Sequence, residues 1–379
     1  MSVGIIGCGS MGSGIAQVAA QAGEWVLVFD TNSEAIKRAK VSLEAILSRL
    51  VEKQRITAEK KDEILSRIEF VDSLKKLSRC NLVIEAIVEK MEAKQSVFEM
   101  LEKIVDVNCV LASNTSSLSI ASLAKGRLHP ERIIGLHFFN PAPLMPLVEL
   151  IPSLLSSNTI VENVRSRVAN WGKTVVLAKD TPGFIVNRVA RPFYGEALKM
   201  YEEGVGSIQE IDQAMREYGG FKMGPFQLMD LIGNDVNYAV TTTVWTQFYY
   251  DPRFKPSLTQ CRMAEAGLLG RKSGQGYYSY PLNENALTPL DEAKAKYLFE
   301  RIFFMLVNEA YDALFMQVAS AEDIDLAMQQ GVNYPKGLIA WGKEYGLQTV
   351  LAGLEFLFEE YGDDRYRPNP LLRKTAKAI

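Results

Sequence analysis

The stretch "VGIIGCGSMGSGIAQVAAQAGEWVLVFD", residues 3–30, predicts a strand, a glycine turn, a helix and a second strand. Gly7, Gly9 and Gly12 form the pattern G-x-G-x-x-G between the first strand and the helix. The first glycine permits a tight turn, the second lets backbone approach a pyrophosphate, and the third allows close packing of helix on strand. The N-terminus of the helix then offers N–H groups and a partial positive charge to phosphates. The stretch therefore predicts a dinucleotide-binding unit.

Asp30 indicates which dinucleotide this unit binds. It ends the second strand, eighteen residues after Gly12, and no arginine follows it immediately. A carboxylate at this place accepts hydrogen bonds from a ribose diol and repels a 2′-phosphate. The pattern favours NAD over NADP. Cys8 fills a variable position of the turn, and we interpret it as a small packing residue.

Strands and helices continue to alternate after residue 30. Apolar residues recur at three- and four-residue spacing over 33–53 and 58–67, which predicts helices, and another helix is expected over 90–105. Short apolar strands are expected at 81–87, 109–113, 132–139 and 173–178. Such alternation is typical of a mostly parallel sheet covered on both faces. The N-terminal part is therefore predicted to be an α/β Rossmann-type domain.

From about residue 185 the sequence reads as helical to its end, apart from a connector over 270–289 that is rich in glycine, proline and asparagine. A shift of 113 residues aligns 188–233 with 301–346, with eleven identities in 46 positions where about three are expected. An internal duplication explains this similarity. We predict an NAD-binding domain over 1–180 and an all-α C-terminal domain in two tandem copies, over 181–282 and 283–379.

Composition excludes several classes of protein. Lys plus Arg (42) nearly balances Asp plus Glu (45), so the net charge of −3 favours neither nucleic acid nor a charged interaction tail. No apolar run reaches the roughly 18 residues that span a bilayer, and the early first strand leaves no room for a leader peptide. The four cysteines show no paired spacing, and with two histidines a metal site is not expected. We expect a cytoplasmic protein without metal.

One of the two histidines lies in "GLHFFNPAPLMPLVELI", residues 135–151. His137 ends a predicted strand, and Glu149 belongs to the next strand, beyond a turn rich in proline. Histidine suits proton transfer because its ordinary pKa is about 6.5, and a carboxylate partner fixes its tautomer. The spacing leaves two interpretations open, a catalytic pair and a structural histidine. His129 precedes a proline in a polar loop and is expected at the surface.

Seven motifs together resemble a known family. They are "GIIGCGSMGSGIAQ", "VIEAIVEKMEAKQ", "SNTSSLSI", "GLHFFNPAPLMPLVE", "DTPGFIVNR", "KMGPFQLMDLIG" and "GRKSGQGYY". Their order and spacing over about 1–280 are similar to those of the 3-hydroxyacyl-CoA dehydrogenases, of the bacterial 3-hydroxybutyryl-CoA dehydrogenase type. The resemblance implies reversible, NAD-dependent oxidation of a (3S)-3-hydroxyacyl-CoA to the 3-ketoacyl-CoA.

The resemblance also implies roles for individual residues. His137 would be the general base and Glu149 its partner. Ser116 would hydrogen-bond the reacting oxygen, and Asn187 would hold the substrate. Positions that contact the nicotinamide half of the cofactor match Glu89, Lys94 and Asn140. Coenzyme A would lie along the helices of 33–67, where Lys53 is a candidate for binding one of its phosphates.

Two other functions remain possible from the sequence. One is a dehydrogenase of a free hydroxy acid, of the gulonate or carnitine type, and the other is a non-enzymatic NAD-binding or structural protein. The intact set of His137, Glu149, Ser116 and Asn187 argues against the latter. Acyl chain length, a preference for a dicarboxyl-CoA and the direction used in the cell do not follow from the sequence.

The second helical copy is expected to carry no chemistry, because Glu300 stands where the first copy has Asn187. We expect it to pack on the first copy about a pseudo-twofold axis and to bury a face that would otherwise dimerise. The chain would then be a monomer, or a homodimer formed through another surface.

Overall fold

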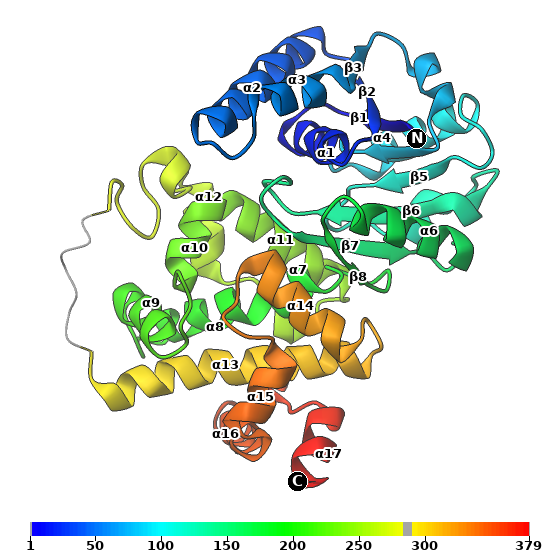
Figure 1. Cartoon of the computed structure of the whole chain (residues 1–379). Coiled ribbons are helices and arrows are strands. Elements are labelled where there is room, and N and C mark those ends of the chain that lie inside the picture. The colour runs from blue at the N-terminus through cyan, green and yellow to red at the C-terminus, as the bar shows by residue number, and fades with distance from the viewer. Residues whose placement is uncertain (1, 283–289, 379) are drawn as a thin grey trace. The chain divides into compact units, whose positions relative to one another are not determined.

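The computed structural model describes residues 2–282 and 290–378 (Figure 1). The chain divides into two compact units, Met1–Thr181 and Pro182–Ile379. Each unit is described by itself below.

The first unit is built on one eight-stranded sheet in the order β3-β2-β1-β4-β5-β6-β7-β8. All neighbouring strands are parallel except β6 and β7, which are antiparallel. The strands are β1 (Ser2–Ile6), β2 (Trp25–Phe29), β3 (Ile68–Val71), β4 (Leu82–Glu85), β5 (Val110–Ser113), β6 (Ile133–Phe138), β7 (Leu147–Pro152) and β8 (Thr174–Leu177). The predicted α/β sheet is confirmed; β3 is a strand that the sequence pattern did not single out.

Helices cover both faces of this sheet. They are α1 (Ser10–Gln21), α2 (Ser33–Glu52), α3 (Ala58–Ser66), α4 (Met91–Glu102), α5 (Ile120–Ala124) and α6 (Asn158–Ala169), with 3₁₀ helices η1 (Leu74–Arg79) and η2 (Pro130–Arg132). One core joins apolar residues of α1, α2 and α6 to alternate strand residues such as Ile134 and Leu136. On the opposite face α5 lies against β6, where Ile120 packs over Gly135. Burial on both faces explains why these strands are almost continuously apolar.

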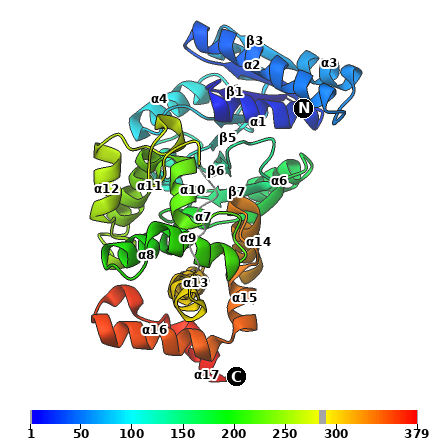
Figure 2. The ribbon, with the colours of Figure 1, turned by 90° about the vertical axis from the view of Figure 1, so that its left-hand side faces the viewer.

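The second unit is helical throughout its described part. Its elements are α7 (Val186–Val189), α8 (Arg191–Glu202), α9 (Ile208–Glu217), α10 (Pro225–Ile232), α11 (Asn234–Gln247), η3 (Pro252–Phe254), α12 (Leu258–Glu265), η4 (Arg271–Ser273), α13 (Glu292–Phe315), α14 (Ala321–Val332), α15 (Leu338–Tyr345), α16 (Leu347–Tyr361), η5 (Asp364–Tyr366) and α17 (Pro370–Ala378). The long helix α13 contacts α8 and α9 on one side and α15, α16 and α17 on the other (Figure 2).

The second unit repeats itself element by element. Helices α9, α10, α11 and α12 have counterparts in α14, α15, α16 and α17, and η3 corresponds to η5. The bounds of α10, shifted by 113, coincide with those of α15. Two tandem helical copies are therefore confirmed. Their proposed boundary at 282/283 stays a prediction, because residues 283–289 of the connector lie outside the described residues.

Reciprocal ion pairs join the two copies. The Nε of Arg188 in the first copy donates to Glu309 of the second at 2.7 Å. The equivalent residues exchange roles, because Nε of Arg301 in the second copy donates to Glu196 of the first at 2.6 Å. All four side chains are buried. When the same two residue types pair in both directions across an interface, the two sides are related by a twofold axis and the interface is isologous.

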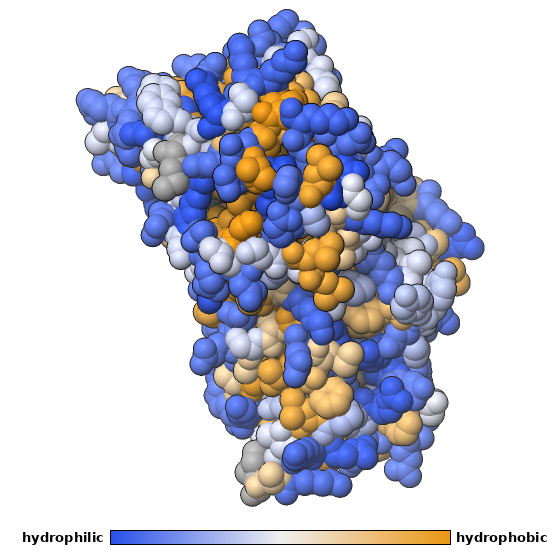
Figure 3. Space-filling model, turned by 90° about the vertical axis from the view of Figure 1, so that its right-hand side faces the viewer, coloured by the Kyte–Doolittle hydropathy of each residue, from blue (hydrophilic) through white to orange (hydrophobic). Residues whose placement is uncertain are grey.

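The surface gives no sign of a membrane span in the described part of the chain. No helix there is both long enough and apolar enough to cross a bilayer. On the face drawn in Figure 3, hydrophobic residues lie in separate groups among hydrophilic ones.

Candidate active site

The glycine turn has the geometry that a dinucleotide requires. Gly7 has φ +92°, and a side chain at Gly12 would begin 1.8 Å from the carbonyl oxygen of Gly7. Nothing lies within 4 Å of the position that a Cβ of Gly9 would take, so backbone is open to a ligand there. Within residues 2–282 and 290–378, no side chain caps the N-terminus of α1. Open backbone at an uncapped helix N-terminus fits the pyrophosphate of a dinucleotide.

Asp30 follows β2 directly and is held in place by backbone. The N–H of Cys8 donates to one carboxylate oxygen at 2.9 Å, and the N–H of Asn32 donates to the other at 2.8 Å. Burial opposes the charge of Asp30, but these hydrogen bonds outweigh it and lower its pKa below the ordinary 3.8. Burial raises the pKa of the Cys8 thiol to about 12, so the thiol stays protonated. A fixed, ionised carboxylate fits the ribose diol of NAD.

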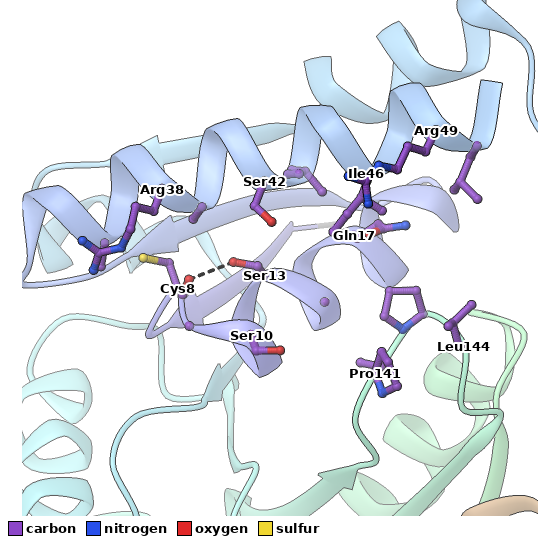
Figure 4. A pocket seen from close by; sticks show the side chains of 18 of the residues that line it. Cys8, Ser10, Ser13, Gln17, Arg38, Ser42, Ile46, Arg49, Pro141 and Leu144 are labelled. Carbon is purple, nitrogen blue, oxygen red and sulfur yellow. Dashed lines mark hydrogen bonds between the residues drawn. The ribbon is translucent and has the colours of Figure 1, made fainter. Parts of the chain in front are cut away.

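A cavity of about 740 Å³ lies in the first unit between α1, α2 and the loop that follows β6. Figure 4 shows Arg38, Ser42, Ile46 and Arg49 of α2 on one side and Ser10, Ser13 and Gln17 of α1 on the other. Pro141 and Leu144 come from the loop. Lys53, at the C-terminal end of α2, also lines the cavity. Apolar walls with three basic side chains suit a ligand that has both apolar and phosphate parts.

Antiparallel pairing of β6 with β7 places His137 directly opposite Glu149. Their side chains meet, with Nδ1 of His137 2.6 Å from Oε2 of Glu149. Glu149 is fully buried, whereas the side chain of His137 is 9% exposed. The ring of Phe139 lies 4.5 Å from the imidazole, centroid to centroid. The turn rich in proline thus returns the chain so that the two predicted partners touch.

A second polar group forms where β4 and β5 end. Glu89 accepts hydrogen bonds from the side chain of Thr115 at 2.6 Å and from the N–H of Ser116 at 2.8 Å. Its other oxygen lies 3.2 Å from Nζ of Lys94. Burial opposes the charge of Glu89, but Lys94 and these hydrogen bonds lower its pKa. Three residues singled out from the sequence, Glu89, Lys94 and Ser116, are thus brought together.

Known proteins are similar to this chain over its whole length. The family model "3-hydroxyacyl-CoA dehydrogenase, NAD binding domain" matches residues 2–181, and the model of the C-terminal domain matches residues 183–280 and 297–379. The chain belongs to the 3-hydroxyacyl-CoA dehydrogenase family. It is an NAD-dependent oxidoreductase that oxidises hydroxyacyl-CoA.

Individual relatives support the same assignment. The 3-hydroxyadipyl-CoA dehydrogenase of Escherichia coli K12 is 37% identical, over 99% of this chain and 97% of that protein. The 3-hydroxybutyryl-CoA dehydrogenase of Bradyrhizobium diazoefficiens is 41% identical, over 73% of this chain and 94% of its own length. A crystal structure of a 3-hydroxybutyryl-CoA dehydrogenase from Escherichia coli K12 covers 100% of this chain and 98% of its own, with a TM-score of 0.95 and 37% identity.

The remaining residues that the family resemblance singled out lie in different places. The amide oxygen of Asn140 is 3.4 Å from the hydroxyl of Ser10, at the N-terminus of α1. Asn187 lies in α7 of the second unit, and Nε of Arg191 donates to its backbone carbonyl. His129, expected at the surface, has a side chain that is 42% exposed and 3.3 Å from Glu131.

Sequence reasoning missed Glu85, the residue that holds Lys94 in place. Glu85 is fully buried and accepts hydrogen bonds from Lys94, from the hydroxyl of Ser113 and from the N–H of Ile87, each at 2.7 Å. A charged residue inside the apolar run "LVIEAI" was the available signal. A buried acid must be paired or hydrogen-bonded, so it predicts a buried cation nearby.

The structure also bears on metals and thiols. In the described ranges, no group of three His, Cys, Asp or Glu side chains is arranged to hold a metal ion. All four cysteines are free, and three of them are buried.

Proposed function

We propose that the chain interconverts (3S)-3-hydroxyacyl-CoA and 3-ketoacyl-CoA, with His137 as the general base. NAD, when bound, accepts the hydride that leaves carbon 3 of the substrate. The hydrogen bond of 2.6 Å between His137 and Glu149 carries the proposal, because it prepares a proton acceptor in the same unit as the dinucleotide-binding turn.

Glu149 prepares His137 for this role. When Nδ1–H of a neutral imidazole donates to a carboxylate, the lone pair of the ring lies on Nε2. Nε2 then takes the hydroxyl proton of the substrate as the carbon–hydrogen bond breaks. The resulting imidazolium is stabilised by the negative charge of Glu149, which is fully buried and therefore poorly screened. In the reverse direction the same nitrogen returns the proton.

Ser116 and Asn187 are proposed to position the substrate. The hydroxyl of Ser116 would steady the reacting oxygen, and its backbone is fixed for this by the hydrogen bond to Glu89. Asn187 would hold the thioester end. Glu89, Lys94 and Asn140 would contact the nicotinamide half of the cofactor, and the mutual contacts of Glu89 and Lys94 support a shared role.

We propose that coenzyme A lies along α2, in the cavity that Figure 4 shows. Arg49 and Lys53 line it one turn apart, and Arg38 lies further toward the start of α2. Their positive charges would bind phosphates, while Leu43 and Ile46 offer apolar contact to the pantetheine arm.

We also propose that the protein is located in the cytoplasm.

The test is a comparison of initial rates of NAD reduction with CoA thioesters and free acids. The thioesters are (3S)-3-hydroxybutyryl-CoA, longer homologues and 3-hydroxyadipyl-CoA; the free acids are 3-hydroxybutyrate, gulonate and carnitine. We expect kcat/KM for at least one thioester to exceed that of every free acid by about 100-fold or more, because remote binding energy lowers the barrier. Equal rates with a free acid would show that the chain oxidises free hydroxy acids.

A matched pair of variants separates the coenzyme A site from the chemistry. Lys53→Gln should raise KM for the thioester several-fold and leave the Kd for NAD unchanged. Lys37→Gln is the control, because Lys37 lies on the same helix and pairs with Glu34 at an exposed place. If both variants behave alike, Lys53 does not bind the phosphate.

A further inference from the structure

A cavity of about 730 Å³ lies wholly within the second unit, and none of its lining residues belongs to the candidate active site. We call it the repeat cavity, because both helical copies build it. Residues of α8, α11, η3 and α12 line it from the first copy, and η5 lines it from the second. The charged or aromatic members that matter here are Lys199, Glu202, Trp245, Lys255, Asp363 and Arg365.

Arg365 is buried in the wall of the repeat cavity and is poorly paired. The residue is 8% exposed, and in residues 2–282 and 290–378 its Nε finds no hydrogen-bond partner. A carboxylate oxygen of Glu196 lies 3.8 Å from that Nε. Oε1, the other oxygen of Glu196, is already held by Arg301 at 2.6 Å. Arg365 therefore shares Glu196 with Arg301 and meets it at 3.8 Å, which is longer than a hydrogen bond.

The corresponding arginine of the first copy, Arg253, has more acidic partners than Arg365. The pattern Asp-x-Arg-aromatic occurs at 251–254 and again at 363–366, where the shift between the copies is 112 residues instead of 113. In both places the aspartate accepts the N–H of the arginine. Arg253, the counterpart of Arg365, pairs with Asp251 at 2.9 Å, with Glu309 at 3.2 Å and with Asp312 at 2.9 Å.

One substitution between the copies explains the difference. Asp312, which pairs with Arg253, corresponds to Lys199 under the shift of 113. The repeat cavity therefore has a cation where the related site has a carboxylate. Lys199 pairs with Glu203 at 3.0 Å, and Glu203 also pairs with Arg301. Arg365 thus keeps Glu196 but has a lysine where Arg253 has its second carboxylate on α13, Asp312.

The other polar groups of the repeat cavity favour a negative ligand. Lys255 adds an exposed ammonium, and Nε1 of Trp245 is a buried donor without a partner in the described part of the chain. Oε1 of Glu202 accepts from the hydroxyl of Ser257 at 2.6 Å and from the N–H of Thr259 at 3.0 Å. Asp363 accepts the N–H of Arg365 at 3.0 Å. The cations that line the cavity, Lys199, Lys255 and Arg365, thus exceed its two acids by one.

Gly195, within α8, leaves the guanidinium accessible from the repeat cavity. A Cβ at this place would stand 3.4 Å from Nη2 of Arg365. Glycine in a helix interior lowers stability by about 0.5–1 kcal/mol relative to alanine. The absence of a side chain at Gly195 leaves space beside the guanidinium of Arg365, which offsets this cost if a ligand binds there.

We infer that the repeat cavity binds an oxyanion, a carboxylate or phosphate group of a small molecule, against Arg365. The planar guanidinium offers two parallel N–H groups to such a group, Lys199 and Lys255 supply charge, and Trp245 supplies a further donor. The bound anion takes the place that Asp312 occupies beside Arg253. Because η5 belongs to the second copy, the site exists only in a chain that has both copies.

Calorimetric titration of the full-length chain with inorganic phosphate, and separately with succinate, tests the inference. Saturating NAD is present throughout, so that the pyrophosphate site on α1 is filled. We expect one of the two anions to bind with a Kd of about 1 mM or tighter at low ionic strength. Preference for phosphate identifies a phosphate-bearing ligand, and preference for succinate identifies a carboxylate. Failure of both to bind the wild-type chain would overturn the inference.

Variants decide whether the anion is in the repeat cavity. Lys199→Asp copies Asp312 and gives Arg365 an internal partner, so the anion should bind at least about tenfold more weakly. Arg365→Gln should weaken binding as much, and Lys255→Gln, at the exposed rim, should weaken it several-fold without affecting the fold. Lys37→Gln, at an exposed place in the first unit, should leave the titration unchanged.

Thermal unfolding gives an independent readout. Phosphate or succinate should raise the Tm of the wild-type chain but not that of Lys199→Asp, because the aspartate already fills the place of the anion. The Tm of Lys199→Asp without anion should be no lower than that of the wild type. If Lys199→Asp and Lys255→Gln both bind the anion as the wild type does, the anion binds elsewhere and the inference is wrong.

Discussion

At the residue scale, the carboxylate of Asp30 is fixed before any cofactor arrives. Backbone N–H groups of Cys8 and Asn32 hold its two oxygens. A preorganised acceptor loses little entropy when it binds a ribose diol. The same charge repels a 2′-phosphate. We therefore expect affinity for NAD and discrimination against NADP to depend on this one side chain.

Asp30→Ala tests both effects together. We expect the Kd for NAD to rise about tenfold and the preference for NAD over NADP to narrow, because repulsion is lost along with the hydrogen bonds. Fluorescence titration of NADH and NADPH measures both. Glu34→Ala, an exposed acid four residues away, is the control. Equal use of both cofactors by the wild-type chain would contradict this role of Asp30.

The binding of NAD should not depend on pH near neutrality. The lowered pKa of Asp30 means that its negative charge is lost only when the pH falls below the ordinary 3.8. The Kd for NAD should therefore stay constant between about pH 8 and pH 5. A tenfold loss of NAD affinity between pH 7 and pH 5 would contradict this role of Asp30.

At the scale of elements, the antiparallel pair β6–β7 makes the proposed catalytic pair possible. In a parallel arrangement a crossover connection would separate the two strands. Here a short turn brings Glu149 back opposite His137 in direct register. A slip of one residue would move Glu149 to the other face of the sheet, so register is under strong constraint.

Much of the fold and of the candidate site could be predicted from local sequence patterns. The features that could not be predicted depend on contacts between residues that are distant in sequence. The glycine turn, Asp30 and the β6–β7 return follow from short stretches with known stereochemistry. Glu85 was missed because a single acid in an apolar strand reveals its partner only after folding places Lys94 beside it. The pairing of Arg188 with Glu309 spans 121 residues, and no periodicity encodes it.

The duplicated caps of α10 and α15 provide a prediction at this scale. Asp325 accepts the N–H groups of Ile339 at 2.7 Å and Ala340 at 3.0 Å, as Asp212 does for the equivalent residues of α10. Asp325→Ala leaves both donors without this partner, so we expect a loss of about 1–3 kcal/mol in the free energy of unfolding. Denaturant titration measures it.

Glu322→Ala is the control for this prediction. Glu322 lies in the first turn of the same helix, α14, but is exposed, so its replacement should change stability by about 0.5 kcal/mol or less. If the two variants lose the same stability, the cap at Asp325 is not a stabilising feature.

At the scale of the whole molecule, the second helical copy acts as a covalent partner. Helix α13 buries Leu298, Ile302 and Leu306 within the second unit. A tether makes this docking intramolecular, at an effective concentration of order millimolar. We expect the chain to be a monomer, or a homodimer formed through another surface. In the second copy Glu300 accepts a hydrogen bond from Tyr345, and a role without chemistry stays our prediction for that copy.

Deletion of residues 285–379 tests the role of the second copy. The truncated chain would leave Arg188 and Glu196 without their partners and expose the apolar face that α13 covers. We expect it to dimerise or aggregate, which light scattering detects. A truncated chain that remains a stable monomer would contradict the pseudo-dimer.

The assignment of the proton acceptor is the central claim, and single-turnover NAD reduction by His137→Gln tests it most directly. Glutamine keeps a polar side chain of similar length but cannot take up a proton. We predict that the variant binds NAD and 3-hydroxybutyryl-CoA with wild-type affinity and reduces NAD about 100- to 10,000-fold more slowly. A near-normal rate in His137→Gln would contradict the account.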